Sequence, residues 1–402
     1  MAITITHQPQ VYTPSENQIV WQVSTDATTL VYFKVDMYQA GTTNLVNTFN
    51  IYPTPASPTV SYIELGRILR SFVKWQADNT YSALSKPLNV PVFAYRLVFT
   101  EILYDPSTGI YSTGATYDNS GDKFWVWNAS LDRIAFKAYV QNNFVVNSST
   151  TSRFLTNKPD GAKVNDFSSE VLYFLQDSQT ALSVQVKTYN GSTLLNTYNS
   201  TVTGLTTNNM YRVHVSPKAL NSILAVDFTD VTKYTVQLLD GSSAARSELR
   251  KYFYTSFECN YDYHNIWFSN NLGGFDVYQS INPQKTIATK EVNIRKNIYQ
   301  FDDAGLYTDN NGGIYNPSIE NINVTTTTSF KAVSRPLTDN EAVWLIEMFQ
   351  SRQAYLELAD GMLVPITINA KSYPIMLNKY KREQPNWLDI DYTVSDNLQP
   401  TI

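Results

Sequence analysis

One stretch of this sequence recurs in a similar form. Its first copy reads Val35-Asp-Met-Tyr38-Gln-Ala-Gly41-Thr-Thr-Asn-Leu45-Val-Asn-Thr-Phe-Asn50, and its second reads Val186-Lys-Thr-Tyr189-Asn-Gly191-Ser-Thr-Leu194-Leu-Asn-Thr-Tyr-Asn199. Like most of the sequence, both copies read as short strands with period-two alternation, broken by Gly and Asn. This pattern favours β-sandwiches over alternating strands and helices.

Three further pairs of segments follow in the same order, which indicates an internal repeat. They are Tyr62–Ser71 with Tyr211–Ser222, Tyr95–Val98 with Tyr234–Gln237, and Lys123–Val126 with Lys251–Tyr254. The spacing is shorter in the second copy, as an extra loop near Asp105 to Asp118 in the first copy would produce. We therefore predict a mainly β chain with tandem Ig/fibronectin-like sandwiches, at 1–130 and 131–257.

The remaining region, 258–402, has a different pattern. Thr338-Asp-Asn-Glu341 forms a capping box before Ala342, Leu345, Ile346 and Phe349, whose spacing gives one apolar stripe. This predicts one helix near 338–351. Strands are expected around it, with Asp360-Gly361 as a type I′ hairpin turn. The third region is therefore predicted to be an α+β domain.

Composition excludes several classes of protein. Charged residues make up only 16% of the chain, below the roughly 25% of a typical soluble domain, while 28 tyrosines and 19 phenylalanines favour strands. The net charge of −5, with both signs interspersed, argues against a nucleic-acid partner. Neither a signal peptide nor a run of 18 apolar residues is present, which predicts no export signal and no membrane segment.

The sequence offers little for catalysis or for metal and cofactor binding. His7, His214 and His264 are scattered and have no metal-ligand spacing, and Cys259, the one cysteine, lies in an aromatic context without a neighbouring base. A single cysteine forms no internal disulfide, which fits assembly in a reducing cytoplasm. The loop from Asp302 to Gly313 gathers oxygen ligands suited to calcium, but a solvated turn is the simpler interpretation. We therefore predict no catalytic residue, no metal and no cofactor.

Two alternatives to a purely structural role remain open. Trp125, Trp127 and Trp267 could stack on sugar rings, as in a receptor- or carbohydrate-binding module, although core packing is the commoner use of such residues. A glycan hydrolase would need two carboxylates about 5–10 Å apart, and no pair stands out among 35 acidic residues.

A motif in the third region resembles a known family. Trp267-Phe-Ser-Asn270-Asn-Leu-Gly273-Gly274-Phe-Asp276 resembles the W-x-N-x-x-G-G-[WF]-D stretch of tail and baseplate-type virion proteins from phages and prophages of Bacteroidetes, including crAss-like phages. Leu337–Ile368 is similar to the helix and strands that close the same proteins, and Tyr62–Phe72 is similar to a segment of their leading sandwich. From the residues themselves, Asn270-Asn271 and Gly273-Gly274 are expected to supply positive φ angles in a tight hairpin.

The resemblance implies a non-enzymatic bacteriophage structural protein, a subunit of a tail, tail-hub or baseplate ring. Its expected partners are further copies of itself in a homo-oligomeric ring and other phage tail or connector proteins. Its expected location is the virion tail, after assembly in the cytoplasm of the bacterial host. The motif residues Trp267, Asn270, Gly273, Gly274 and Asp276 are expected to serve the fold and the assembly.

Overall fold

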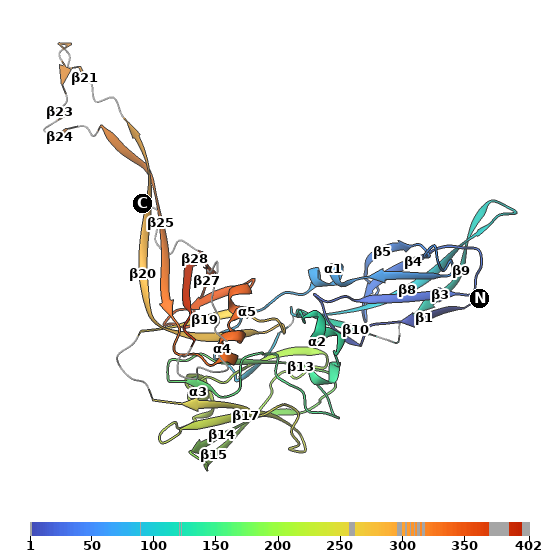
Figure 1. Cartoon of the computed structure of the whole chain (residues 1–402), viewed down its shortest axis with the longest axis horizontal. Coiled ribbons are helices and arrows are strands. Elements are labelled where there is room, and N and C mark those ends of the chain that lie inside the picture. The colour runs from blue at the N-terminus through green and yellow to red at the C-terminus, as the bar shows by residue number, and fades with distance from the viewer. Residues whose placement is uncertain are drawn as a thin grey trace. The chain divides into compact units, whose positions relative to one another are not determined.

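The computed structural model describes residues 2–88, 90–119, 121, 123–256, 262–295, 300–301, 304–305, 307–308, 310–311, 314–315, 318–369 and 386–395. Strands dominate these residues, and the helices are few and short. The predicted fold class is confirmed: the chain is mainly β, with tandem sandwiches followed by a region that contains both strands and helices (Figure 1).

The first sandwich contains two sheets. The smaller sheet has the order β1-β3-β6, with bounds Ile3–His7, Val20–Thr25 and Val60–Glu64. The larger sheet has the order β2-β10-β8-β4-β5, with bounds Tyr12–Pro14, Phe124–Trp127, Val92–Asp105, Leu30–Gln39 and Leu45–Ile51. The predicted extra loop of this copy is a further strand, β9 (Ile110–Asp118), which pairs with β8.

The second sandwich also contains two sheets. One has the order β12-β18-β17-β14-β15, with bounds Ala162–Val164, Arg250–Tyr254, Lys233–Asp240, Leu182–Asn190 and Thr193–Thr201. The other has the order β11-β13-β16-β7, with bounds Val145–Val146, Val171–Gln176, Asn209–His214 and Ser85–Leu88. Strand β7 comes from the stretch of chain that joins β6 to β8, so one strand of this sheet originates in the first 130 residues.

The two larger sheets share one topology. Each begins with a parallel pair, β2 with β10 and β12 with β18, and continues through antiparallel pairs to an edge hairpin. The repeated stretch forms that hairpin in both copies, β4–β5 and β14–β15. Each hairpin has a register shift just before its tyrosine, so Tyr38 pairs with Leu45 and Tyr189 pairs with Leu194. The collinear segments therefore fall on equivalent strands.

The repeated tyrosines also make the same contact. The Arg96 guanidinium lies 4.3 Å from the centre of the Tyr38 ring, and the Lys233 ammonium lies 5.0 Å from the centre of the Tyr189 ring. In each case the cation is supplied by the cross-strand partner of the tyrosine. Such cation–π pairs stabilise the hairpins from the neighbouring strand.

Each sandwich has its own apolar core, built from the inward-facing residues of both sheets. In the first, Trp21 contacts Phe124 edge to face, with ring centres 4.6 Å apart. In the second, Tyr234 stacks on Tyr252 at 5.0 Å and its hydroxyl donates a hydrogen bond to the carbonyl of Val215. The helices α1 (Gly66–Leu69) and α3 (Pro217–Leu224) follow equivalent strands, and each buries a leucine, Leu69 or Leu220.

The C-terminal region is built on a closed barrel. Its strand order is β19-β20-β25-β28-β27-β26, with bounds Tyr263–Ser269, Phe275–Arg295, Ile319–Val333, Asp389–Val394, Leu363–Ile368 and Ala354–Glu357. Four two-residue strands, β21 to β24, lie between β20 and β25 in the chain: Gln300–Phe301, Tyr307–Thr308, Asn310–Asn311 and Ile314–Tyr315. Closing the sheet removes its edges wherever the barrel strands are paired.

By contacts the chain divides into two units. Unit 1 comprises 1–259, 267–279 and 343–352, and unit 2 comprises 260–266, 280–342 and 353–402. The hairpin 267–279 and the segment 343–352 lie in the predicted third region of the sequence. Their contacts nevertheless place them in unit 1, together with the two sandwiches. The physical reason is their burial, because the hairpin turn and the buried face of 344–348 pack in unit 1.

The predicted helix at 338–351 is divided in two. Helix α4 spans Asp339–Trp344 and α5 spans Ile346–Gln350, with Leu345 between them. Leu345 is fully buried, as the apolar stripe predicts, but Ile346 and Phe349 are only half-buried, while Trp344 and Met348 are buried instead. The interruption rotates the buried face relative to the one that a continuous helix would have.

The capping box is present as predicted. The Glu341 carboxylate accepts a hydrogen bond from the Thr338 amide at 2.9 Å, and the Thr338 hydroxyl accepts one from the Glu341 amide at 3.3 Å. We expect Thr338→Ala to lower the free energy of unfolding by about 1 kcal/mol, since a lost N-cap typically costs 0.5–2 kcal/mol. Urea denaturation would measure this, with Thr338→Ser as the control that keeps the hydroxyl. Equal losses for both variants would argue against the cap.

The turn at Asp360-Gly361 differs from the predicted type I′ turn. The Leu358 amide donates to the carbonyl of Met362, so three residues form the loop, and only Gly361 has a positive φ. A type I′ turn would need positive φ at both central residues. The short sequence Asp-Gly fits the three-residue hairpin loop equally well, because such loops also place Gly at their last position.

Candidate functional site

The motif that carries the family resemblance forms a hairpin turn in unit 1. Trp267, Asn270, Gly273, Gly274 and Asp276 are all buried, and Trp267 is completely inaccessible to solvent. The turn is closed by a hydrogen bond of 3.0 Å from the Asn270 amide to the carbonyl of Gly274. The motif is therefore an interior element, which no external substrate reaches in this conformation.

Asn270 organises the turn through its side chain. Its Oδ1 accepts hydrogen bonds from the amides of Leu272 and Gly274, both at 3.0 Å. Its Nδ2 donates to the carbonyl of Leu155 and to the Asp276 carboxylate. Only Gly273 has a positive φ, at 97°, so the prediction that the asparagines and both glycines supply such angles is wrong. The side-chain bonds of Asn270 hold the turn in place of those angles.

The two glycines allow close approach to the sandwiches. A Cβ atom on Gly273 would lie 2.6 Å from the carbonyl oxygen of Asn128, and one on Gly274 would lie 2.7 Å from the ring of Tyr173. The indole of Trp127 donates a hydrogen bond to the carbonyl of Leu272 at 3.1 Å. The turn is thus packed against residues of both repeats, Trp127 and Asn128 from the first and Tyr173 from the second.

Asp276 ends the motif as a buried acceptor. Its Oδ1 accepts from Asn270 at 3.0 Å, and its Oδ2 accepts from the indole Nε1 of Trp344 at 2.7 Å. Trp344 also receives the ammonium of Lys158 over its ring, at 5.1 Å from the ring centre. The C-terminal end of α4 is therefore fixed to the motif by a charge-assisted hydrogen bond.

Lys158 forms a buried ion pair beside the motif. Its ammonium pairs with the Glu170 carboxylate and donates to the carbonyl of Val277 at 2.8 Å. Both side chains are over 90% buried, so each charge depends on the other for its solvation. The sequence does not indicate this pair, because Asn-Lys158-Pro-Asp-Gly reads as an ordinary surface turn and nothing in it predicts burial.

Glu347, on α5, is a further buried carboxyl group beside the motif. It accepts hydrogen bonds from Asn157 Nδ2 at 2.6 Å and from the Asn271 amide at 3.2 Å. Burial, and next the charge of Asp276, raise the pKa of Glu347 from its ordinary value of 4.5 to about 7. The folded protein consequently holds this proton more tightly than the unfolded chain does.

This proton makes stability depend on pH in a defined direction. Stability from Glu347 is fully present below about pH 4.5 and is lost as the pH rises to about 7. His214 acts oppositely, because burial, and next Arg212, lower its pKa from 6.5 to about 3. The two effects overlap in pH, but the variant Glu347→Gln retains His214, so comparison with this variant isolates the contribution of Glu347. The unfolding free energy of the wild type minus that of Glu347→Gln should increase as the pH falls from about 7.5 to about 5. A difference that stays constant in urea titrations would contradict this.

The three histidines lie on three different strands, β1, β16 and β19. His7 is exposed on β1, whereas His214 is buried, stacked on Tyr81 at 4.7 Å and edge-on to Trp267 at 6.5 Å. His264 contacts the Tyr392 hydroxyl and the Phe330 ring in unit 2. Within the described parts of the chain, no three His, Cys, Asp or Glu side chains are grouped so that they could hold a metal ion. Cys259 lies outside the described residues, as does much of the Asp302–Gly313 loop.

Two of the three tryptophans considered for sugar stacking lie in the interior of the protein. Trp127 and Trp267 are completely buried, and Trp125 is half-buried and stacked on Tyr12 with ring centres 6.3 Å apart. Among the described residues, one exposed pair of aromatic rings is that of Tyr104 and Tyr111, across the β8–β9 ladder, with ring centres 5.2 Å apart. Core packing is thus the use made of Trp127 and Trp267.

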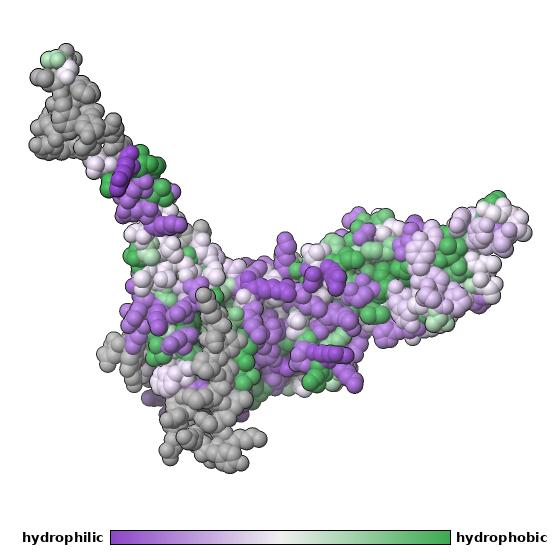
Figure 2. Space-filling view, turned by 45° about the horizontal axis from the view of Figure 1, so that its top comes forward, coloured by the Kyte–Doolittle hydropathy of each residue, from purple (hydrophilic) through white to green (hydrophobic). Residues whose placement is uncertain are grey.

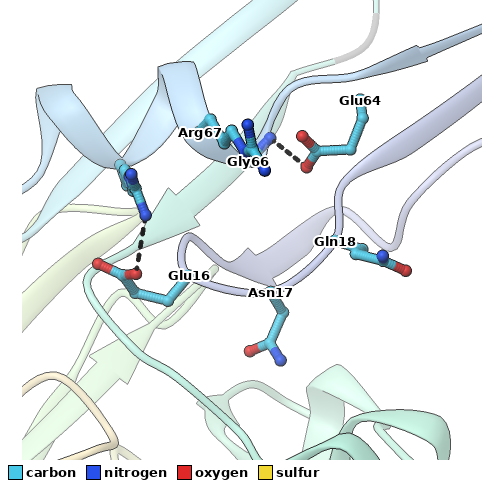
Figure 3. Close-up of a pocket in the computed structure, with 7 residues that line it drawn as sticks. Glu16, Asn17, Gln18, Glu64, Gly66 and Arg67 are labelled. Atoms are coloured by element: carbon cyan, nitrogen blue, oxygen red, sulfur yellow. Dashed lines mark hydrogen bonds and ion pairs between the residues drawn. The ribbon is translucent and has the colours of Figure 1, made fainter.

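A surface hollow of about 400 Å³ lies in the first sandwich, between the loop that joins β2 to β3 and the segment that contains the end of β6 and α1 (Figure 3). It is lined by Glu16, Asn17, Gln18, Glu64, Gly66, Arg67 and Arg70. Both carboxylates are already engaged: Glu64 accepts from the Gly66 amide at 2.7 Å, and Glu16 pairs with Arg70 at 3.5 Å and with Arg352 at 2.7 Å. They serve as local acceptors in this arrangement rather than as a pair poised for proton transfer.

Comparisons with known proteins give no family. No family model and no curated protein matches the chain. Among solved structures, a titin substructure is 6% identical over 64% of this chain and 100% of its own, with a TM-score of 0.25. A marsupial T cell receptor is 9% identical over 83% and 96%, with a TM-score of 0.20. Latent PorU of Porphyromonas gingivalis is 9% identical over 82% and 32%, with a TM-score of 0.18. These scores are too low to carry an argument about function.

None of the helices in the described residues has the length and apolar character needed to span a bilayer.

Proposed function

We propose that this protein is a non-enzymatic virion structural protein of a bacteriophage, a subunit of a ring in the tail, tail hub or baseplate. Its partners are further copies of the same chain and other tail or connector proteins. Its place is the virion tail, after assembly in the host cytoplasm. The proposal extends to Bacteroidetes phages, including crAss-like phages, because their virion proteins carry the motif that Trp267–Asp276 resembles.

One observation supports the proposal more than any other. The residues that carry the family resemblance are buried and bind one another and the two sandwiches: Asn270 holds the turn, Gly273 lies against Asn128, and Asp276 accepts from Trp344. A motif used in this way positions domains and needs no access to substrate. A structural protein requires such fixed connections, since its function is to keep its surfaces in register with neighbouring subunits.

The composition supports the same proposal. Permanent assemblies use large, relatively apolar interfaces, enriched in aromatic residues and depleted in charge at their centres. This chain has 16% charged residues and 13% aromatic residues. It also exposes large apolar side chains on several strands, among them Leu45, Ile110 and Leu194.

The test combines composition of the virion with behaviour in solution. Mass spectrometry of purified virions from the phage that encodes this chain should find it at a fixed ratio to other tail proteins, and immunogold labelling should place it on the tail. Mass photometry of the recombinant protein should find a closed oligomer. Absence from virions would overturn the proposal, and a reproducible hydrolase activity would favour the enzyme alternative.

A further inference from the structure

The strands β20 and β25 extend far beyond the rest of the barrel. Asn282, with a positive φ of 48°, lies at a register shift between Ile281 and Gln284, and from there the two strands pair with each other as far as Arg295 and Ile319. Strand β28 pairs with β25 only over Ser329–Val333. Figure 1 shows the resulting two-stranded ribbon, defined here as 284–295 and 319–328, running past β27 and β28.

This ribbon exposes apolar side chains along its length. The exposed fractions are 50% for Ile287, 48% for Val292, 40% for Ile294, 52% for Ile319 and 60% for Ile322. Figure 2 shows hydrophobic and hydrophilic residues side by side on this segment. An isolated two-stranded hairpin is at best marginally stable in water, because it has no further layer or strand against which to pack. A ribbon of this length therefore gains stability from a partner.

In the part of the chain that the structure describes, the ribbon consists of these two strands alone. Within the described residues, no third strand pairs with 284–295 of β20 or with 319–328 of β25. Natural proteins protect such edges with proline, charge or strong twist. Here the run from Asn321 to Phe330, which includes Thr325-Thr-Thr-Thr328, contains neither charge nor proline and is rich in β-branched residues.

We propose that the ribbon is the self-association surface of this protein: the free edge of β20 in one copy pairs with the free edge of β25 in the next. The inference rests on the proposed function as a ring subunit and specifies the contact that closes the ring. The occupant of each edge is a second copy of this chain. Because the two edges differ, the contact is heterologous and repeats from copy to copy until the ring closes.

Charge favours this pairing over the alternatives. The β20 edge carries Lys285, Lys290 and Arg295 against one acidic residue, whereas β25 has no basic residue between Ile319 and Phe330. Pairing β20 with β20 would bring these basic residues together, and like charges across an interface are unfavourable. Pairing β25 with β25 would leave both β20 edges open. Only β20 with β25 uses both edges and avoids the repulsion.

The sign of a charge added to β25 provides the test. Thr327 is exposed and lies opposite Ala288 in its own ribbon. We expect Thr327→Lys to raise the concentration for half-assembly about tenfold or more, because the new ammonium faces the basic β20 edge of the next copy. Thr327→Glu should leave assembly unchanged or strengthen it, and adding Lys290→Glu to Thr327→Lys should restore it. Mass photometry over a concentration series measures each value.

A cross-linking experiment tests the identity of the paired edges. Two proteins, each with Cys259→Ser, would carry either Thr289→Cys on β20 or Thr325→Cys on β25. A flexible bis-maleimide should cross-link the mixture into dimers, and should cross-link either protein alone much less. Thr197→Lys, on the exposed strand β15, is the matched control, expected to assemble like wild type. Thermal melts of all variants verify that they fold.

Several outcomes would overturn the inference. These are a monomeric wild type at all concentrations, equal weakening by Thr327→Lys and Thr327→Glu, unaltered assembly in every ribbon variant, or loss of assembly with Thr197→Lys alone. If the protein is found in virions and forms rings that the ribbon variants do not alter, the proposed function stands and only this contact is wrong. If the protein is absent from virions, the proposed function fails whatever the ribbon does.

Discussion

Replacing Gly273 with alanine should lower the free energy of unfolding of unit 1 by about 3–5 kcal/mol. Two costs add at this position. A non-glycine residue at a φ of 97° is strained by about 1–3 kcal/mol, and overpacking in a filled interior costs a similar amount. The added Cβ would lie 2.6 Å from the carbonyl oxygen of Asn128. Because that oxygen belongs to the backbone, it cannot move aside as a flexible side chain would.

Gly191 provides the matched control. It also has a positive φ, at 58°, but a Cβ there would meet nothing within 4 Å. We expect Gly191→Ala to cost only the strain, about 1–2 kcal/mol. Urea denaturation of the full chain, followed by tryptophan fluorescence, would give both values. Equal losses for the two glycines would show that the contact with Asn128 contributes nothing, and the close packing of the turn would then be wrong.

Replacing Lys158 with methionine should cost about 3–5 kcal/mol. The substitution keeps most of the side-chain volume and removes the positive charge, so that the buried Glu170 carboxylate loses the Lys158 ammonium. The carbonyl of Val277 also loses its donor. An uncompensated buried charge is far more costly than the loss of the attraction alone, so the effect should approach that of a large core deletion.

Two further variants separate burial from charge in this prediction. Lys251 and Asp160 form an exposed pair 3.8 Å apart, and Lys251→Met should cost at most about 1 kcal/mol. Adding Glu170→Met to Lys158→Met should recover much of the loss, because no unpaired charge then remains. A double variant that is as unstable as the single one would mean that packing, rather than charge, decides the stability there.

The sandwiches could be predicted from sequence because their signal is local and repeated. Tyr38 and Tyr189 stand in the same alternating pattern, and a strand requires alternation over only a few residues. The capping box at Thr338 is similarly local. The buried ion pair depends on packing rather than on a local pattern. Lys158 and Glu170 lie 12 residues apart, on different segments, and Val277, whose carbonyl accepts from Lys158, is 119 residues further along the chain than Lys158.

The tight hairpin turn predicted within 267–276 is present, but the interactions that hold it were only partly predicted. Glycine and asparagine pairs suggest positive φ angles, and Gly273 has one. Asn270 instead forms four hydrogen bonds through its side chain, with partners that include Leu155 and Asp276. The sequence shows which hydrogen bonds an asparagine side chain can form. Which of them it forms depends on the positions of neighbouring groups in the folded protein, and a local sequence pattern does not give those positions. The break between α4 and α5 has the same origin, because tertiary packing at Leu345 outweighs a continuous apolar stripe.

Strand β7 has a consequence for the order in which the chain is synthesised and folded. It pairs with β16, so that Leu88 lies opposite Met210, and Arg212 on β16 binds Asp78 just before β7 at 3.0 Å. A ribosome delivers β7 together with the first sandwich, long before β16 has been translated. During that interval β7 has no partner, and β16 later completes the second sandwich only by recruiting a strand already present. Nascent chains released before residue 209 should therefore fold their first repeat while β7 lacks the strand with which it pairs in the full chain.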